Sequence, residues 1–280
     1  MKKLLLLVLP ILMFGKVHYA KVEPLERATI KASVGGTITK VDLSAEGRIA
    51  GGGVVIQIDD QMDRISLKTS QDSLKLFQET LQINQEIVKG LEETYGLKKD
   101  YFDRVNGLES STQTQKDNAY NALIGAKNQL LGTKEKIVNL KKQILDLEYK
   151  ISMLQDSIAK KQIVLKGRYL YKIMVRAGEF ASPGLPLAIA DDLSKAKLTI
   201  YLDRDELKDI QNKKVYIDGA EDGVAISRIW KEADEKFISA YRAEIILEPT
   251  YPFSTLLKIS SFKILEPNFG RLLLISLISL

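Results

Sequence analysis

The chain has 280 residues, and its 41 Lys and Arg against 36 Asp and Glu give a net charge of +5. These charges are spread along the sequence without a dense basic patch interleaved with aromatic residues, so we do not expect nucleic acid as a partner. The absence of cysteine from the sequence excludes thiol catalysis, cysteine-ligated zinc and disulfides. The only histidine, His18, lies in or near an N-terminal leader, so a histidine-based triad or metal site is excluded for the mature protein.

Residues 1–20 are typical of a secretory leader. Two lysines precede an apolar run over residues 4–14, which is shorter than the roughly 20 residues of a membrane span. Cleavage after Ala20 would place His18 at a position where a smaller residue is usual. The segment is therefore either a cleaved signal peptide or a retained anchor. A buried N-terminal helix is disfavoured, because the run has no polar face.

Residues 21–60 have the two-residue apolar period of β-strands, interrupted by glycines that suit tight turns. This block is too small to form a core by itself. Asp59 and Asp60 close it and can cap a following helix.

Residues 61–167 are predicted to form a long helical hairpin, because apolar residues recur at the a and d positions of a heptad repeat. Gly90 and Gly96 weaken the first arm by about 1 kcal/mol each. Asn106, Gly107 and a Ser/Thr/Gln-rich run form the turn, in which Ser110 with Gln113, or Thr112 with Gln115, has the spacing of a capping box. Gly167 is expected to end the second arm. The a positions of the first arm are Leu67, Leu74, Leu81, Val88, Tyr95 and Phe102, and those of the second are Leu123, Leu130, Ile137, Ile144, Ile151, Ile158 and Leu165.

Residues 168–194 return to the β period and repeat the pattern of the first block. Gly47-x-Ile49 matches Gly178-x-Phe180, and the Asp59-Asp60 pair matches Asp191-Asp192. The predicted helical hairpin, or rod, separates the two copies of this repeat. This arrangement suggests that the two halves pair with each other and that the hairpin is an insertion into one β domain.

Residues 195–248 contain several short strands with turn signals, which predict a small β-barrel. Asp203 to Ile210 is expected to be one helical segment within it. Residues 249–280 are an uncertain tail. Its apolar end could be a last strand, a membrane-surface segment, or a truncated or frame-shifted end.

The two half-motifs, Ala32–Ile38 with Val41 and Gly47, and Val175–Leu187, resemble those of the periplasmic adaptor family, also called membrane fusion proteins of the haemolysin-secretion and multidrug-efflux type. The resemblance covers residues 22 to 247. It implies an α+β protein: a split biotinyl-lipoyl-like β domain with an inserted long antiparallel coiled-coil α-hairpin, followed by a small β-barrel.

The resemblance also implies a function without enzymatic activity. Such an adaptor lies in the periplasm, associated with the inner membrane, and links an inner-membrane transporter of ABC or RND type to a TolC-like outer-membrane channel as a homo-oligomer. The family's tip contacts fall on Arg104 and Leu108, whereas the third expected position holds Gln115 instead of Ser, so Ser111 or Thr112 is the expected substitute. The alternative function is an exported coiled-coil scaffold without a transport role.

A cofactor-carrying enzyme domain is the third interpretation. A lipoyl-type carrier needs a modified lysine at the turn between the halves, where this chain has the rod, so we expect no cofactor. The Asp59-Asp60 and Asp191-Asp192 pairs would attract a divalent cation only if the halves brought them together. Carboxylates at strand ends are more often caps, and we expect no metal.

Overall fold

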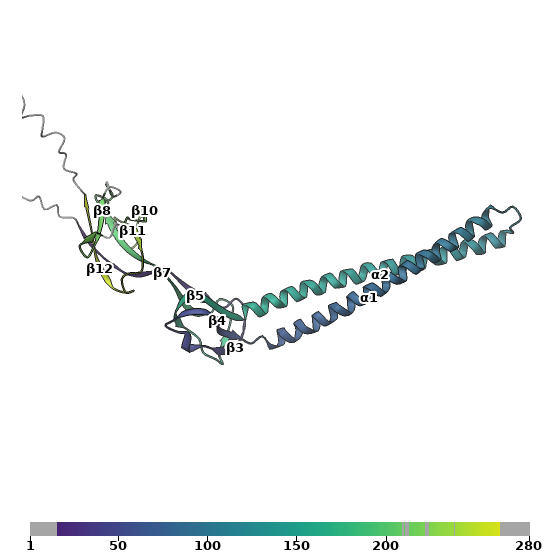
Figure 1. Cartoon of the computed structure of the whole chain (residues 1–280), viewed down its shortest axis with the longest axis horizontal. Coiled ribbons are helices and arrows are strands. Elements are labelled where there is room, and N and C mark those ends of the chain that lie inside the picture. Colours follow the sequence, from purple (N-terminus) through teal and green to yellow (C-terminus); the bar gives the residue numbers. More distant parts are fainter. Residues whose placement is uncertain (1–15, 209, 211–212, 222–223, 238, 264–280) are drawn as a thin grey trace, which may run out of the picture.

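The computed structural model describes residues 16–208, 210, 213–221, 224–237 and 239–263 (Figure 1). The apolar run of the predicted leader and the apolar C-terminal end lie outside these residues. A long helical hairpin extends from one end of two β domains. The elements are, in order, β1 (Val17–Lys21), β2 (Glu23–Lys31), β3 (Gly36–Val41), a short 3₁₀ helix (Leu43–Ala45), β4 (Ile49–Ile58), α1 (Gln61–Gly107), α2 (Gln113–Lys160), β5 (Gln162–Ile173), β6 (Phe180–Ala181), β7 (Pro186–Asp203), β8 (Lys213–Ile217), β9 (Ala220–Glu221), β10 (Arg228–Ala233), β11 (Ala240–Leu247) and β12 (Leu256–Lys263).

The first β domain is built from both sides of the hairpin, as the split repeat predicts. Strand β4, before the rod, pairs antiparallel with β5, after it, and β3 pairs with β6. The two matched glycines occupy equivalent places: Gly47 N–H donates to the carbonyl of Leu170, and Gly178 N–H donates to the carbonyl of Ile38. The core draws on both halves and contains Ile38, Ile56, Ile58, Leu170, Ile173, Val175 and Leu187.

The second β domain has its own core, formed by the outer part of β7 together with β1, β8, β11 and β12. In the described residues its strands belong to two sheets, one with the order β1-β12-β8-β9 and one that includes β10, β11 and β7. A domain of short strands therefore follows the hairpin, where the sequence predicts a small β-barrel, and its described strands lie in two sheets. It also recruits the N-terminal strand β1, which pairs with β12 in register Ala20 to Leu257.

A two-stranded ribbon joins the two β domains. Strand β7 is 18 residues long, and β2 pairs with it from Glu23 opposite Lys197 to Lys31 opposite Pro186. Midway, Arg27 donates two hydrogen bonds of 2.8 Å to the buried carboxylate of Asp191. The guanidinium of Arg27 also lies 4.4 Å from the ring centroid of Tyr171 on β5, so three strands are tied together at this point.

The rod consists of two arms, α1 of 47 residues and α2 of 48 residues, that pack antiparallel. At 1.5 Å per residue each arm is about 70 Å long. The predicted heptad seam is confirmed, because the buried positions of both arms fall on it. These are Ser70 and Asn84 in α1, and Ala119, Ala126, Leu130, Leu140 and Ile144 in α2. Among the described residues, neither these arms nor any other helix is long and apolar enough to cross a membrane.

The second arm ends earlier than predicted. Helix α2 stops at Lys160, and β5 begins at Gln162, so Gly167 does not end the helix. Leu165, counted as a heptad position, is instead buried in the core of the first β domain. The reason is that Ile163, Val164 and Leu165 suit a strand as well as a helix, and pairing with β4 decides between the two.

Other expected boundaries also differ from the observed elements. Residues 204–208 form turns after β7 in place of the expected helical segment. The boundary at residue 20 falls inside β1, and the segment from 249 contains β12. The sequence does not reveal β1 and β12 as strands, because each lies beside an apolar terminal run and because they pair with each other over a long sequence distance.

Candidate docking site at the hairpin tip

The tip is a short, well-capped turn between the two arms. Helix α1 ends at Gly107, and its cap residue Leu108 adopts extended backbone and donates its N–H to the carbonyl of Val105 at 3.4 Å. Four residues later Thr112 caps α2. The backbone N–H of Ser111 donates to the carbonyl of Leu108 at 3.2 Å, which closes the turn between the two caps.

Thr112 and Gln115 form the capping box that their spacing predicts. The N–H of Gln115 donates to Thr112 Oγ1 at 3.3 Å, and the N–H of Thr112 donates to Gln115 Oε1 at 2.9 Å. Both side chains therefore satisfy backbone donors at the start of α2. This fixes the tip geometry and commits Thr112 to the turn itself, which leaves the half-buried Ser111 beside it as the other hydroxyl of the predicted set.

Arg104 and Leu108 are both exposed at the end of α1. Arg104 lies in the last turn, where its positive charge is favoured by the negative end of the helix dipole. The side chain of Leu108 is 55% exposed, so the tip does not bury it under the turn. Below the tip the rings of Phe102 and Tyr120 pack with their centroids 5.7 Å apart and hold the arms together. The structure thus brings all four predicted residues to one end of the rod, about 70 Å from the β domains.

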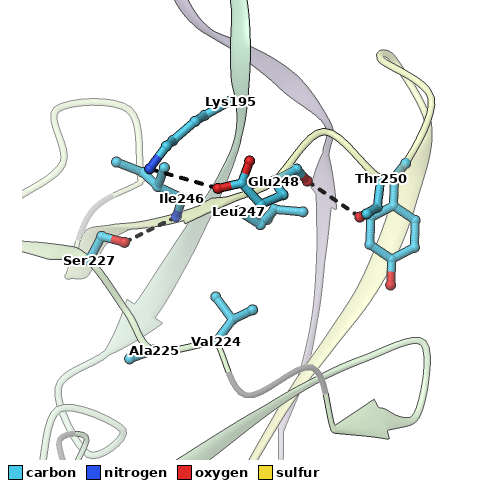
Figure 2. A pocket seen from close by; sticks show the side chains of 9 residues that line it. Lys195, Val224, Ala225, Ser227, Ile246, Leu247, Glu248 and Thr250 are labelled. Carbon is cyan, nitrogen blue, oxygen red and sulfur yellow. Dashed lines mark hydrogen bonds and ion pairs between the residues drawn. The ribbon is translucent and has the colours of Figure 1, made fainter.

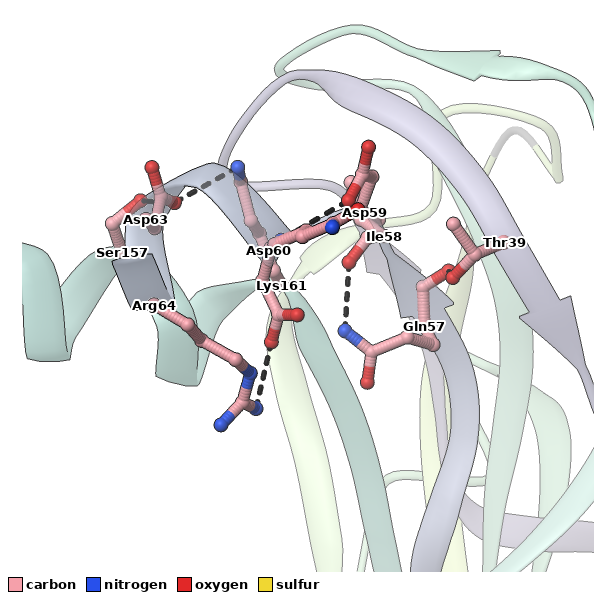
Figure 3. A network of polar contacts seen from close by, with 10 residues as sticks. Thr39, Gln57, Ile58, Asp59, Asp60, Asp63, Arg64, Ser157 and Lys161 are labelled. Carbon is pink, nitrogen blue, oxygen red and sulfur yellow. Dashed lines mark hydrogen bonds and ion pairs between the residues drawn. The ribbon is translucent and has the colours of Figure 1, made fainter. Parts of the chain in front are cut away.

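At the opposite end, polar contacts hold the two arms and the β domain together (Figure 3). Lys161 Nζ lies 2.9 Å from Asp63 Oδ2, and Ser157 Oγ donates to the same oxygen at 2.9 Å. These hydrogen bonds hold the pKa of Asp63 below its usual range, although partial burial opposes them. Sequence reasoning missed this cluster. The sequence does contain one signal for it: residue 161 is a d position of the heptad repeat, where an apolar residue is expected, but it is a lysine.

The aspartate pairs do not form a cation site. Asp60 accepts a hydrogen bond from Arg64 Nη2 at 2.8 Å, which lowers the pKa of Asp60, and Asp59 accepts the N–H of Gln61 at 3.1 Å. On the other half, Asp191 is bound by Arg27, and Asp192 accepts the N–H of Ser194. Within the described ranges, no cluster of three His, Cys, Asp or Glu could hold a metal ion.

A cavity of about 800 Å³ lies in the second β domain (Figure 2). Its polar groups are used within the domain: Ser227 Oγ accepts the N–H of Ile246 at 3.1 Å, Thr250 Oγ1 donates to the carbonyl of Glu248 at 3.3 Å, and Lys195 lies 3.9 Å from Glu248. These contacts stabilise the strand ends. They assign no chemistry to the cavity.

No protein-family model matches the chain, and no curated protein sequence matches it. Solved structures do. MacA from Actinobacillus actinomycetemcomitans is 17% identical, with a TM-score of 0.64 over 89% of this chain and 79% of that one. A chimera of MacA with the α-hairpin domain of Pseudomonas aeruginosa MexA is 14% identical, with a TM-score of 0.56 over 89% and 82% of the two chains.

A third similar structure comes from Streptococcus pneumoniae R6. The membrane fusion protein Spr0693 is 8% identical, with a TM-score of 0.54 over 89% of this chain and 100% of that one. At these identities the similarity is one of fold. It extends over the hairpin and both β domains, in the order that the sequence predicts. The chain therefore has the fold of the membrane fusion proteins, or periplasmic adaptors.

Proposed function

We propose that the chain is a periplasmic adaptor, without enzymatic activity, that links an inner-membrane transporter to a TolC-like outer-membrane channel. The observation that carries the proposal is the rod, which presents a capped tip with exposed Arg104 and Leu108 far from the β domains. A structure of this kind suits a protein that bridges two partners across a distance. The β domains lie at the end of the rod opposite the tip, the end assigned to the inner membrane, and several copies assemble in the complex.

The tip offers two kinds of contact to a channel. The guanidinium of Arg104 is a planar fork of donors, which suits carbonyl and carboxylate acceptors at a channel entrance and which lysine cannot reproduce. Leu108 is an apolar knob, and its burial in a partner would contribute about 1.5–3 kcal/mol. Ser111, whose backbone N–H donates to the carbonyl of Leu108, can supply a hydroxyl, whereas Thr112 contributes by holding the turn.

Tip variants test the proposal by co-purification with the outer-membrane channel. Arg104→Asp should abolish recovery of the channel, and Leu108→Ser should weaken it. Both side chains are exposed, so the melting temperature should change little: the reversed charge at the end of α1 loses only the helix-dipole interaction, about 0.3–1 kcal/mol. The matched control is Lys99→Asp, which reverses an exposed charge on the same arm about one turn below Arg104. Normal recovery of the channel with both tip variants would contradict the docking assignment and favour a scaffold without a transport role.

A further inference from the structure

A cavity of about 360 Å³ lies where the two β domains meet. One wall belongs to the first β domain, with Tyr169 and Tyr171 on β5. Another belongs to the second β domain, with Phe253, which packs against the core of that domain. Pro24 and Leu193 add apolar surface. Small-molecule sites are typically about 300–1,000 Å³ in volume and are lined mainly by apolar and aromatic side chains, so this cavity has the size and the walls of such a site.

Strand pairing explains why charged and aromatic groups share one face of the joint. Arg27 on β2 and Tyr169 on β5 both lie opposite Asp191, which is on the β7 strand between them. Residues directly opposite each other in antiparallel strands point to the same face of the sheet. All three residues line the cavity. The register of the three strands therefore places a charged pair beside an aromatic ring.

Arg27 presents unused donors to this cavity. Its Nε and Nη2 each donate to the carboxylate of Asp191 at 2.8 Å, and its Cζ lies 4.4 Å from the ring centroid of Tyr171. In the part of the chain that the structure describes, the third nitrogen, Nη1, has no hydrogen-bond partner. The side chain of Asp191 is 4% exposed, whereas that of Arg27 is 51% exposed. The buried carboxylate thus holds the guanidinium in place, and Nη1 remains available to an acceptor on a ligand.

A smaller cavity of about 170 Å³ adjoins the first and is positively charged. The two cavities share three lining residues, one of which is Arg27. Lys21 and Lys197 bring the cations around the smaller cavity to three, against the single carboxylate of Glu23. Among the described residues Lys197 forms no ion pair, and its Nζ donates to the carbonyl of Leu25 at 3.4 Å. Its charge is therefore left for an anion that enters the cavity.

We propose that the two adjoining cavities together bind a small aromatic carboxylate. We call them the joint site. The ring lies between the β5 tyrosines and Phe253, and the carboxylate faces Nη1 of Arg27 and Nζ of Lys197. The aromatic walls select the ring, and the excess of cations at one end selects the anion. This inference does not depend on the proposed adaptor function, because neither the tip nor a protein partner takes part in it.

The joint site touches both β domains, so its occupant couples them. The β5 wall belongs to one domain and Phe253 to the other, and the ribbon of β2 and β7 runs between the two (Figure 1). A ligand that contacts both walls stabilises the arrangement in which both are in place, by mass action. Binding should therefore protect the ribbon against local opening.

Calorimetric titration of the purified full-length protein tests the site, with 2-naphthoate as the probe. Saturable binding of one molecule per chain is expected. The matched probe is 2-naphthamide, which keeps the rings and removes the charge, and it should bind severalfold more weakly. Absence of saturable binding of 2-naphthoate, or equal affinity for the two probes, would overturn the proposal.

Variants test where the probe binds. Lys197→Gln removes one of the cations, and Tyr171→Ala removes a ring that is 48% exposed, and each should weaken the binding of 2-naphthoate severalfold. The matched controls are Lys195→Gln, on the same strand but lining the cavity of about 800 Å³, and Tyr149→Ala, on α2 with 69% exposure. Both controls should bind normally, and thermal melts check that every variant is folded. Unchanged affinity in both site variants, or loss of binding in Lys195→Gln alone, would contradict the location.

Hydrogen exchange read by mass spectrometry gives the location without a substitution. Saturating 2-naphthoate should slow exchange in peptides from β2 and β7 and leave peptides from the middle of α1 and α2 unchanged. The same amount of 2-naphthamide should give less protection. Protection confined to residues 224–227 and 246–251, which line the cavity of about 800 Å³, would place the probe there and overturn the joint site.

Discussion

Lys161 and Asp63 join the two ends of the hairpin at its base, with Lys161 Nζ 2.9 Å from Asp63 Oδ2. Asp63 lies in the first turn of α1, and Lys161 caps the end of α2. Each charge also suits the dipole of its own helix end. The N–H of Ile58 donates to the carbonyl of Lys161 at 2.8 Å, so the same residue links the rod to the β4 strand. This pair therefore fixes where the arms leave the β domain.

The Asp63 contact predicts a specific dependence on pH. Because the pKa of Asp63 is lowered in the folded protein, its carboxylate contributes stability above the ordinary pKa of about 3.9, and this contribution is lost as the pH falls through the lowered value. Asp63→Asn should lower the melting temperature at pH 7, and the difference from the natural protein should shrink below about pH 4. Thermal melts of both proteins between about pH 7 and pH 3 measure it.

The control for this prediction is Asp72→Asn. Asp72 and Lys68 form an exposed pair at 3.2 Å on the same helix, and such pairs contribute about 0–1 kcal/mol. Its melting temperature should stay close to that of the natural protein at every pH. If the effect of Asp63→Asn did not change across the same pH range, the carboxylate would not be the source of the stabilisation.

Truncation in the seam should weaken the rod. Ile144 is buried between the arms, and Ile144→Ala should reduce the free energy of unfolding by about 2 kcal/mol, the lower end of the range for buried aliphatic residues. Leu147 is half-buried, so Leu147→Ala should cost less, and Ile144→Asp should cost more because it buries an unpaired charge. Denaturant unfolding followed by circular dichroism gives the values. Met153→Ala, at an exposed site on the same helix, is the control and should change stability by less than about 0.5 kcal/mol.

The rod and the split β domain could be predicted because both leave a periodic signal. Leu130 and Ile144 occupy a positions and Leu140 a d position of the heptad repeat, and all three are buried. The Gly47 and Gly178 pattern marks two halves that pair. Local periodicity reports which face of an element is apolar. It does not report which distant segment covers that face. For this reason the sequence places β1 in a leader and β12 in a tail, although the two strands pair and complete the second β domain.

At the tip, spacing was enough to predict the capping box of Thr112 and Gln115, since both of its contacts are local. The base cluster was not predictable in the same way, because Asp63 and Lys161 meet only after the hairpin closes. A third case is the row of exposed apolar side chains on α1 that includes Ile83, which is 60% exposed. The heptad spacing of Ile83 and its row is visible in the sequence, but only the observed seam shows that this row points away from the partner arm.

Glycine within the rod should be replaceable. Gly96 lies inside α1, and a Cβ there would meet nothing within 4 Å, so Gly96→Ala should raise the free energy of unfolding by about 1 kcal/mol. Gly178→Ala is the matched control, because Gly178 has a φ of +93° in a turn of the first β domain, where a side chain is strained. The same substitution should therefore lower stability at Gly178. Equal signs at the two positions would contradict the assignment of Gly96 to an unobstructed helix surface.

The first β domain should fold without the rod. Gln57 of β4 is already paired with Gln162 of β5, and the core of the domain contains no residue of either arm. Replacing residues 61–160 with Asn-Gly gives a four-residue loop, Asp59-Asp60-Asn-Gly, between the paired Ile58 and Lys161, and should leave a folded protein with a cooperative melt and a strand-rich circular dichroism spectrum. A second variant with Gly-Ser-Gly-Ser at the junction removes any strain from a tight turn. If both variants were unfolded while the natural chain was folded, the rod would be part of the folding unit, and its description as an insertion into a self-sufficient β domain would be wrong.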